Sequence, residues 1–458
     1  MPLDTQFLQS LADIVGEEHV RGQNAVAMLD PGVDPSNFAA GLAVRPSSAT
    51  EVAAILSLCD ATGVPVISHG GRTGLAGGAV SAPGELVLMT DRLDELTIDP
   101  VGRVAIVGAG ISLQNLQEAC AAEGLSPGID LGARGSATIG GMVSTNAGGM
   151  EAFRYGMMRQ RLLGMEAVLA DGTVLCDLAL VPKNNEGYDL RQLFCGAEGT
   201  LGVVTRVTMK LERADPPSVT MLAACPNART AIRAMRNIED RGGMLRAEIM
   251  WRDYARVVAE HTGLSRVLEF CDAAVYLIIE TALDVDGLGE ALSPSLDAGD
   301  VIDAVIAQSG REAADIWRIR EDTFAASWSL PHQLWFDISL PLASLDTYMA
   351  SLRARLDTLA PSLVLFGLGH LADGNLHLTI CRKGSFGPDL RKGISQAVEH
   401  GVKDLGGSVS AEHGIGTAKL AILERNVSAE KLAVMRRLKA ALDPNGILNP
   451  GKVVPAAR

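Results

Sequence analysis

Three histidines and a glutamate fall in two short segments, Gly-His-Leu-Ala-Asp-Gly-Asn-Leu-His and Glu-His-Gly-Ile-Gly. In the first, His370 and His377 flank an Asp-Gly-Asn sequence, which is a strong turn signal. The second supplies Glu412 and His413. Two imidazoles and a carboxylate suit a catalytic zinc-type site, which keeps one position open for substrate. Zinc is the expected metal, and manganese or cobalt is compatible with the same donors.

The turn predicts that His370 and His377 leave and enter adjacent strands. Beyond it, Asn375, His377 and Thr379 should share one face, because successive side chains of a strand alternate. Two other interpretations remain open on these residues alone. The histidines could be hydrogen-bonded members of a plain hairpin, or they could hold the metal-bound water of a metallo-hydrolase.

Glycine is concentrated between residues 70 and 149. One rich segment covers residues 69–79 and a second covers residues 128–149. Glycine exposes successive backbone N–H groups without an obstructing Cβ, so such loops can surround a pyrophosphate or a planar ring. A pair of purely structural glycine turns is the alternative. If the loops do hold a flavin, they count against the hydrolase, which needs none.

A third glycine motif, Val-Gly-Ala-Gly-Ile-Ser-Leu at residues 107–113, imitates a nicotinamide-binding Rossmann turn. The third glycine of that fingerprint is replaced by Leu113. Asp130 lies near the distance expected for the acidic residue, about 20 positions downstream, but in a loop rich in proline and glycine. A tight strand-to-helix turn is the preferred interpretation.

The composition limits the classes of function. At 458 residues the chain fits two or three packed units. A net charge of −14 argues against nucleic-acid binding. The seven cysteines are scattered without a CxxC pair, as in reduced intracellular proteins. Because we find neither a signal peptide nor a transmembrane segment, we expect a cytoplasmic protein, with peripheral association with the inner membrane left open.

Periodicity divides the chain into three parts. Strands and helices alternate up to about residue 213, where Asp-Pro-Pro interrupts the pattern. Beyond it, strand-like runs at 275–279, 334–340, 364–369 and 376–380 indicate an antiparallel sheet flanked by helices. An amphipathic helix is expected at 429–442. We therefore predict domains at 1–213 and 214–424, followed by a C-terminal segment, 425–458.

Residues 65–79, 128–149 and 195–204 resemble the three FAD-contacting segments of the vanillyl-alcohol-oxidase/p-cresol-methylhydroxylase flavoprotein superfamily. Within it the chain is similar to the D-lactate, D-2-hydroxyglutarate and glycolate-oxidase D-subunit branch. Leu-Asn-Pro-Gly-Lys at 448–452 resembles the segment by which that branch returns to its flavin domain. The resemblance implies an α+β fold, with a two-part FAD-binding domain and a substrate (cap) domain built on an antiparallel sheet.

The resemblance also implies which residues bind the cofactor. Relatives with covalent flavin often carry a histidine where Arg72 stands, so we expect non-covalent FAD. The residues expected at the flavin are His69, Gly70, Gly71, Arg72, Thr73, Gly74, Leu75, Gly78, Ala79, Pro127, Gly128, Gly135, Ser136, Ile139, Gly140, Gly141, Asn146, Ala147, Gly148, Gly199, Gly202, Val203, Val204 and Asn449.

For the reaction, the resemblance implies oxidation of a D-2-hydroxy acid to the 2-oxo acid. His370, His377 and Glu412 would hold the metal, and His413 would be the catalytic base. Arg320 matches the arginine that binds the substrate carboxylate, which a planar guanidinium can do bidentately. The substrate hydride would pass to flavin N5.

The expected side-chain pocket departs from relatives that prefer D-2-hydroxyglutarate. The resemblance implies that those relatives hold the distal carboxylate with lysine, threonine and asparagine, where this chain has Trp335, Phe324 and Thr379. Asn375 is a further expected substrate contact. We therefore expect D-lactate and homologues with apolar side chains to be preferred, with D-2-hydroxyglutarate as the alternative. The electron acceptor (an electron-transfer flavoprotein, a quinone or a cytochrome) stays open, and a homodimer is compatible with the sequence.

Overall fold

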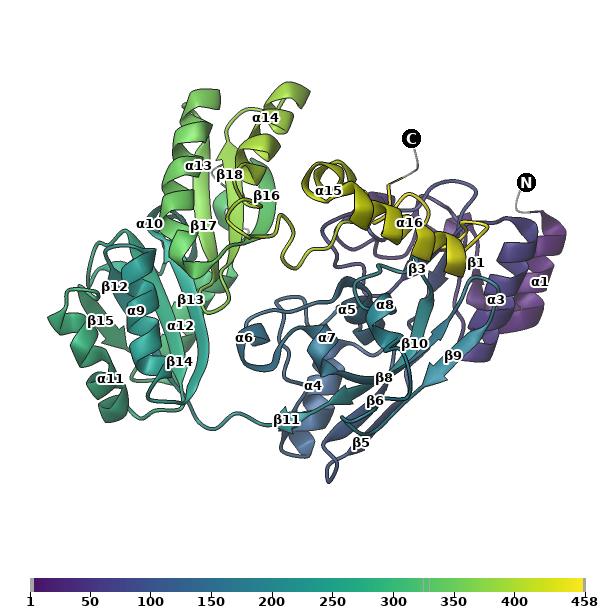
Figure 1. Cartoon of the computed structure of the whole chain (residues 1–458), viewed down its shortest axis with the longest axis horizontal. Helices are drawn as coiled ribbons and strands as arrows, with labels where there is room; N and C mark the ends of the chain where they lie inside the picture. Colours follow the sequence, from purple (N-terminus) through teal and green to yellow (C-terminus); the bar gives the residue numbers. More distant parts are fainter. Residues whose placement is uncertain (1–3, 324, 329, 456–458) are drawn as a thin grey trace. The chain divides into compact units, whose positions relative to one another are not determined.

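The computed structural model describes residues 4–323, 325–328 and 330–455, and its chain divides into two compact units. The first unit contains the residues up to 149, then 155–214 and the chain from 412 onward (Figure 1). The second contains 150–154 and 215–411. The first predicted boundary differs from the observed one by a single residue. The return to the first unit begins at Glu412, before the predicted residue 425.

A small sheet of strand order β1-β2-β4-β3 begins the first unit. Strands β2, β3 and β4 are parallel, and β1 is antiparallel to β2. Their bounds are Val20–Arg21 for β1, Ala43–Val44 for β2, Val66–His69 for β3 and Leu86–Met89 for β4. Beside this sheet pack helices α1 (Thr5–Val15) and α3 (Ala49–Thr62), whose apolar residues share one core with it.

Helix α3 has a cap at each end. The Ser48 side chain accepts a hydrogen bond from the backbone N–H of Glu51, which caps the helix start. Gly63 ends the helix in the left-handed conformation, with φ at 69°. The buried stripe of the helix is Val52, Ile55, Leu56 and Cys59.

The second sheet of the first unit is antiparallel, with strand order β5-β6-β10-β8-β9. Its bounds are β5 (Leu96–Asp99), β6 (Val104–Gly108), β8 (Leu162–Val168), β9 (Val174–Asp177) and β10 (Val203–Lys210). Helices α4 (Leu113–Ala122) and α5 (Ile139–Thr145) share a core with this sheet. Further elements of the unit are β7 (Leu125–Ser126) paired with β11 (Glu212–Arg213), and the helices α2 (Gln23–Val26), α7 (Met158–Arg161), α8 (Arg191–Phe194), α15 (Leu420–Asn426) and α16 (Ala429–Leu442).

The glycine motif after β6 is a packing feature. Strand β6 pairs antiparallel on both sides, whereas a Rossmann turn belongs to a parallel sheet. A Cβ on Gly108 would lie 2.2 Å from the carbonyl oxygen of Leu93, and one on Gly110 would lie 2.2 Å from that of Thr90. These glycines let two backbone segments pass closely, as the preferred interpretation of the sequence had it.

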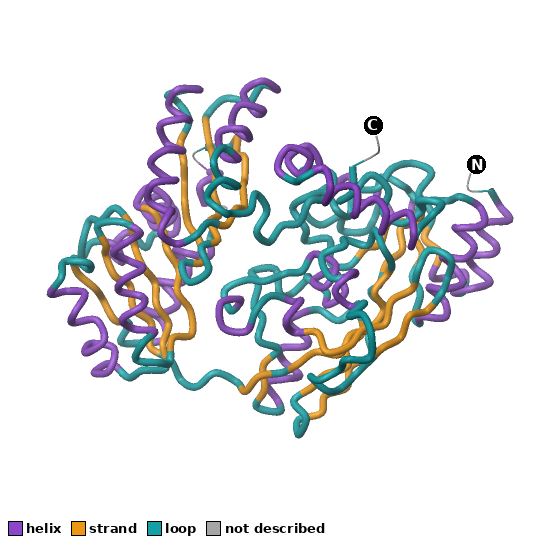
Figure 2. The backbone as a smooth tube through the Cα atoms, viewed as in Figure 1, coloured by secondary structure: helices purple, strands orange, loops and turns teal. Residues whose placement is uncertain are grey.

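The second unit is built on a seven-stranded antiparallel sheet of order β15-β12-β14-β13-β17-β18-β16. The strands are β12 (Val219–Cys225), β13 (Met244–Trp251), β14 (Val275–Thr281), β15 (Asp303–Ile306), β16 (His332–Ser339), β17 (Val364–His370) and β18 (Asn375–Arg382). The helices are α9 (Ala228–Glu239), α10 (Arg252–Thr262), α11 (Val285–Asp297), α12 (Gly310–Glu321), α13 (Leu345–Leu359) and α14 (Pro388–Glu399). Figure 2 shows this sheet with its flanking helices, as predicted.

The two faces of this sheet have different covers. Helices α9, α11, α13 and α14 pack on one face around a large apolar core. Helices α10 and α12 pack on the other, over a smaller core. On this second face, polar side chains replace apolar ones where β13, β17, β18 and β16 run side by side. Across the described ranges, no helix has both the length and the apolar content that spanning a membrane requires.

Candidate active site

A cavity that is partly open to solvent lies among the glycine segments of the first unit. All three segments predicted to contact FAD contribute to its wall. The predicted residues that line the cavity are His69, Gly70, Gly71, Arg72, Thr73, Gly74, Gly78, Ala79, Gly140, Gly141, Ala147, Val203, Val204, Asn449 and the proposed base His413.

Other residues predicted at the flavin are absent from the cavity lining: Leu75, Pro127, Gly128, Gly135, Ser136, Ile139, Asn146, Gly148, Gly199 and Gly202. Some of them contact the residues that line the cavity. The carbonyl oxygen of Ser136, for example, lies 1.8 Å from where a Cβ on Gly71 would stand, and a Cβ on Gly70 would lie 2.3 Å from Oγ1 of Thr138. These two glycines therefore allow one loop to lie on the other.

Asn449 joins the C-terminal segment to the cavity wall. Its Oδ1 accepts a hydrogen bond from the backbone N–H of Ser68 at 3.0 Å, and its Nδ2 donates to the carbonyl of Glu198 at 2.7 Å. The preceding residue, Leu448, forms a parallel bridge with Val66 of β3. One buried amide thus connects segments that are far apart in the sequence, as the resemblance implied for the returning segment.

His69 and Arg72 are held by the loop itself. The His69 imidazole is buried, and its Nε2 donates to the carbonyl of Ala79 at 2.7 Å, which closes the loop. Burial lowers the pKa of His69 to about 3, so the ring is neutral at ordinary pH. The Arg72 guanidinium donates to the carbonyls of Asp30 and Gly70 and lies over the ring of Phe38.

Buried Glu198 fixes the loop that follows His413. Its carboxylate accepts hydrogen bonds from the backbone N–H groups of Ile415 at 2.6 Å and Gly416 at 2.9 Å. Burial raises the pKa of Glu198 above its ordinary value. At the other end of the loop, Oε1 of Glu412 accepts from the N–H of Gly149 at 2.7 Å. His413 is thereby positioned from both sides in the wall of the cavity.

The hairpin of the second unit brings His370 and His377 together, as predicted. Gly374 takes the left-handed conformation at the turn, with φ at 75°. The Nε2 atoms of the two histidines lie 3.4 Å apart, and their rings are nearly perpendicular, at 88°. Two nitrogens bound tetrahedrally to zinc at about 2.0–2.1 Å would be separated by about 3.4 Å. The pair therefore fits two positions of a metal site.

A buried carboxylate that the sequence analysis missed, Glu248, stands behind this pair. Its Oε1 lies 2.6 Å from Nδ1 of His370, and its Oε2 accepts from Nε of Arg320 at 2.7 Å. Burial alone would raise the pKa of Glu248, but the charge of Arg320 and the hydrogen bonds from His370 and Arg320 bring it below its ordinary value. Arg320, which we predicted to bind the substrate carboxylate, and His370, a predicted metal ligand, are therefore both hydrogen-bonded to the carboxylate of Glu248.

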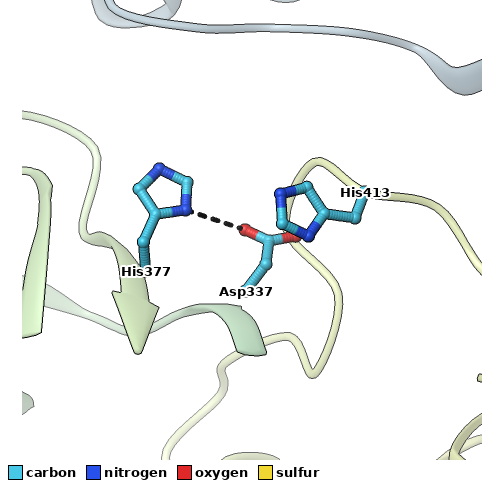
Figure 3. Close-up of side chains that lie close together, drawn as sticks. All are labelled: Asp337, His377 and His413. Carbon is cyan, nitrogen blue, oxygen red and sulfur yellow. Dashed lines mark ion pairs between the residues drawn. The ribbon is translucent and has the colours of Figure 1, made fainter. Parts of the chain in front are cut away.

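Asp337 is the second missed carboxylate. It is fully buried, accepts from Nδ2 of Asn375 at 2.8 Å, and has an oxygen 3.9 Å from Nδ1 of His377 (Figure 3). Asn375, which we expected at the substrate, is itself buried and also donates to the carbonyl of Ile338. In the structure it supports Asp337 from within the sheet.

The expected side-chain pocket is only partly described. Trp335 and Thr379 are direct partners across β16 and β18 and share the face of His377. Trp335 is 42% exposed, and its Nε1 donates to Oε1 of Gln333 at 2.8 Å. Phe324 lies outside the described residues.

Comparisons with known proteins agree with the predicted fold and cofactor. Residues 40–176 match an FAD binding domain, and residues 215–453 match the C-terminal domain of FAD linked oxidases. The mitochondrial D-2-hydroxyglutarate dehydrogenase of Bos taurus is 39% identical over 422 residues, covering 90% of this chain and 76% of that protein. The D-2-hydroxyglutarate dehydrogenase of Xanthomonas citri pv. viticola is 35% identical over 424 residues, covering 89% and 88%.

A solved structure of p-cresol methylhydroxylase with substrate bound superposes with a TM-score of 0.76, covering 98% of this chain and 96% of that one. At 16% identity this likeness shows the fold alone. The predicted α+β architecture of the vanillyl-alcohol-oxidase/p-cresol-methylhydroxylase type is thus confirmed.

Proposed function

The chain belongs to the FAD-linked oxidases, and on this premise we propose that it is a dehydrogenase that oxidises a D-2-hydroxy acid to the 2-oxo acid. The observation that carries the proposal is the shared carboxylate of Glu248. It places Arg320, a group suited to binding a carboxylate, next to His370 and its partner His377, a pair suited to a metal. A 2-hydroxy acid presents a carboxylate and an adjacent hydroxyl.

D-2-hydroxyglutarate is the substrate to test first. The relatives that cover most of this chain at 35–39% identity carry that substrate in their names, which favours the alternative of the sequence analysis over its D-lactate preference. D-lactate and D-2-hydroxybutyrate form the second candidate class. They are favoured by Trp335 and its partner Thr379, neither of which carries a positive charge for a second carboxylate.

The cofactor sites fit the proposed groups. The glycine cavity offers loops without obstructing side chains, and Arg72 at the usual linkage position has no nucleophilic ring nitrogen, so we propose non-covalent FAD. His370 and His377 would hold two positions on a divalent metal. Glu412 would supply a third, as the resemblance implies, since a carboxylate is a usual partner of two imidazoles at such a site.

When bound, FAD would supply the hydride acceptor for oxidation at the substrate Cα, and a metal ion would supply positive charge that favours loss of the hydroxyl proton. Arg320 binds and orients the substrate carboxylate. His413 takes the hydroxyl proton on an imidazole nitrogen, for which its position in the cavity wall is suited. Glu198 holds the His413 loop so that this nitrogen keeps its place.

The test is a substrate panel with a dye as electron acceptor, run with and without a chelator. We expect turnover of D-2-hydroxyglutarate or of D-2-hydroxybutyrate, none of the L-enantiomers, and loss of activity on metal removal. The dye replaces the natural acceptor, for which an electron-transfer flavoprotein, a quinone or a cytochrome is proposed. A colourless protein with hydrolase activity would overturn the proposal in favour of the metallo-hydrolase.

A cytoplasmic location likewise remains a prediction, and the name of the bovine relative places that protein in mitochondria.

A further inference from the structure

Glu248 occupies a place in the sheet where a charge is costly. It lies within β13, pairs in register with His370 of β17, and has no exposed surface. A buried carboxylate is tolerated only when it is paired and hydrogen-bonded. Here each carboxylate oxygen has its own partner, His370 on one side and Arg320 on the other.

These two contacts determine what each partner presents to the site. Because the carboxylate accepts a hydrogen bond from Nδ1–H of His370, the neutral ring has its lone pair on Nε2, and that Nε2 is the atom directed at His377. The bond to Arg320 comes from Nε and fixes the plane of the guanidinium. The side chain of Arg320 is itself 8% exposed, so it has little freedom to take another orientation.

We infer that Glu248 is a positioning residue that sets the separation between the metal-binding histidine pair and the guanidinium that binds the substrate carboxylate. This inference rests on the proposed function. A 2-hydroxy acid has its carboxylate and hydroxyl on adjacent carbons, so the groups that bind them must be held at a matching distance. One rigid carboxylate bonded to both supplies that spacing.

The test compares Glu248→Gln and Glu248→Asp with a matched control, Glu280→Gln. Glu280 lies on the neighbouring strand β14 and also has two partners, accepting from Ser218 at 2.6 Å and from Arg246 at 2.6 Å. The control therefore removes an equivalent carboxylate from the same sheet, away from the histidine pair. The readouts are the affinity for zinc from titration of the apoprotein, kcat and KM separately, FAD absorbance, and the Tm of the apoprotein.

Glu248→Gln keeps the shape of the side chain but offers an amide N–H where an acceptor is needed. We expect zinc affinity and kcat/KM each to fall by about 10–100-fold, the usual cost of losing a residue that orients a ligand. FAD absorbance should be unchanged, since the glycine cavity belongs to the first unit. Glu248→Asp keeps the charge with a shorter reach, so it should retain the fold and lose zinc affinity to a smaller degree. Glu280→Gln should match the wild type in both quantities.

Wild-type zinc affinity and wild-type KM in both Glu248 variants would overturn the inference, as would an equal loss in Glu280→Gln. If Glu248→Gln does not fold, Glu248→Asp decides by the same criterion. Failure of the proposed function looks different, because the wild-type protein itself would then oxidise no D-2-hydroxy acid, while the zinc titration would still report on Glu248.

Discussion

Replacing Trp335 with lysine should move substrate preference toward the dicarboxylate. The position lies on β16, directly across from Thr379 and two residues from Asp337, on the face that carries His377. In wild type, the tryptophan offers an apolar surface and no charge for a distal carboxylate. Lysine there supplies an ammonium group on a flexible stem.

The size of the effect follows from the exposure of the site. Because Trp335 is 42% exposed, water screens the ion pair that the new lysine forms with the distal carboxylate. We therefore expect this pair to stabilise the complex by about 1 kcal/mol, the upper bound for surface ion pairs, and not by the larger value of a buried pair. Loss of contact with one methylene of an apolar substrate costs about 0.8 kcal/mol. At about 1.4 kcal/mol per factor of ten, the ratio of kcat/KM between D-2-hydroxyglutarate and D-2-hydroxybutyrate should rise about twentyfold.

The assay measures kcat/KM for both acids on one preparation each of wild type, Trp335→Lys and the control Trp328→Lys. Trp328 is 76% exposed and stacks on His261, so this control adds the same charge to the same unit. Its ratio should stay at the wild-type value. The reasoning is refuted if Trp335→Lys leaves the ratio unchanged. A wild-type enzyme that already prefers the dicarboxylate by tenfold or more would show that its distal carboxylate is bound elsewhere.

Three further outcomes are expected. Acid or heat denaturation should release all yellow colour as free FAD, measured by absorbance after filtration, whereas colour that stays with the chain would contradict non-covalent binding. His377→Ala should abolish turnover and bind no zinc, yet keep its flavin spectrum; wild-type activity in this variant would make the histidine pair structural. His69 has a folded pKa of about 3, below its ordinary 6.5, so only the unfolded state takes up the proton between these values. The free energy of unfolding should therefore decrease as the pH is lowered through that window, by at most about 1.4 kcal/mol per pH unit. His69→Gln should show a flatter Tm profile between pH 6.5 and 5.

Local sequence patterns predicted the elements that depend on neighbouring residues. The Asp-Gly-Asn turn gave the β17–β18 hairpin and the shared face of His377 and Thr379, because turn chemistry sets the register of a hairpin. The helix expected at 429–442 is α16 (Ala429–Leu442). Ser48 and Ser112 are also local signals, since each side chain caps the helix that follows it.

Glu248 could not be found in the same way. Glu248 contacts His370 only because β13 and β17 are neighbours in the sheet. The two residues are 122 positions apart in the sequence, and no local pattern fixes the pairing of their strands. What the sequence does contain is an ionisable residue amid apolar ones, Ala-Glu-Ile-Met, in a strand. Asp337, in Trp-Phe-Asp-Ile, has the same surroundings. A charge in such a run indicates either a strand edge or a buried partner.

The bridge between Val66 and Leu448 has a consequence for the order in which the protein is assembled. Ser68 and Asn449 are separated by 381 positions, and the whole of 215–411 lies between them. During synthesis from the N-terminus, the seven-stranded sheet can therefore form before the cavity among the glycine segments obtains its last wall. Until Asn449 arrives, Ser68 and Glu198 lack the amide that connects them. The nascent chain should thus acquire FAD late, as a step that follows translation of both units.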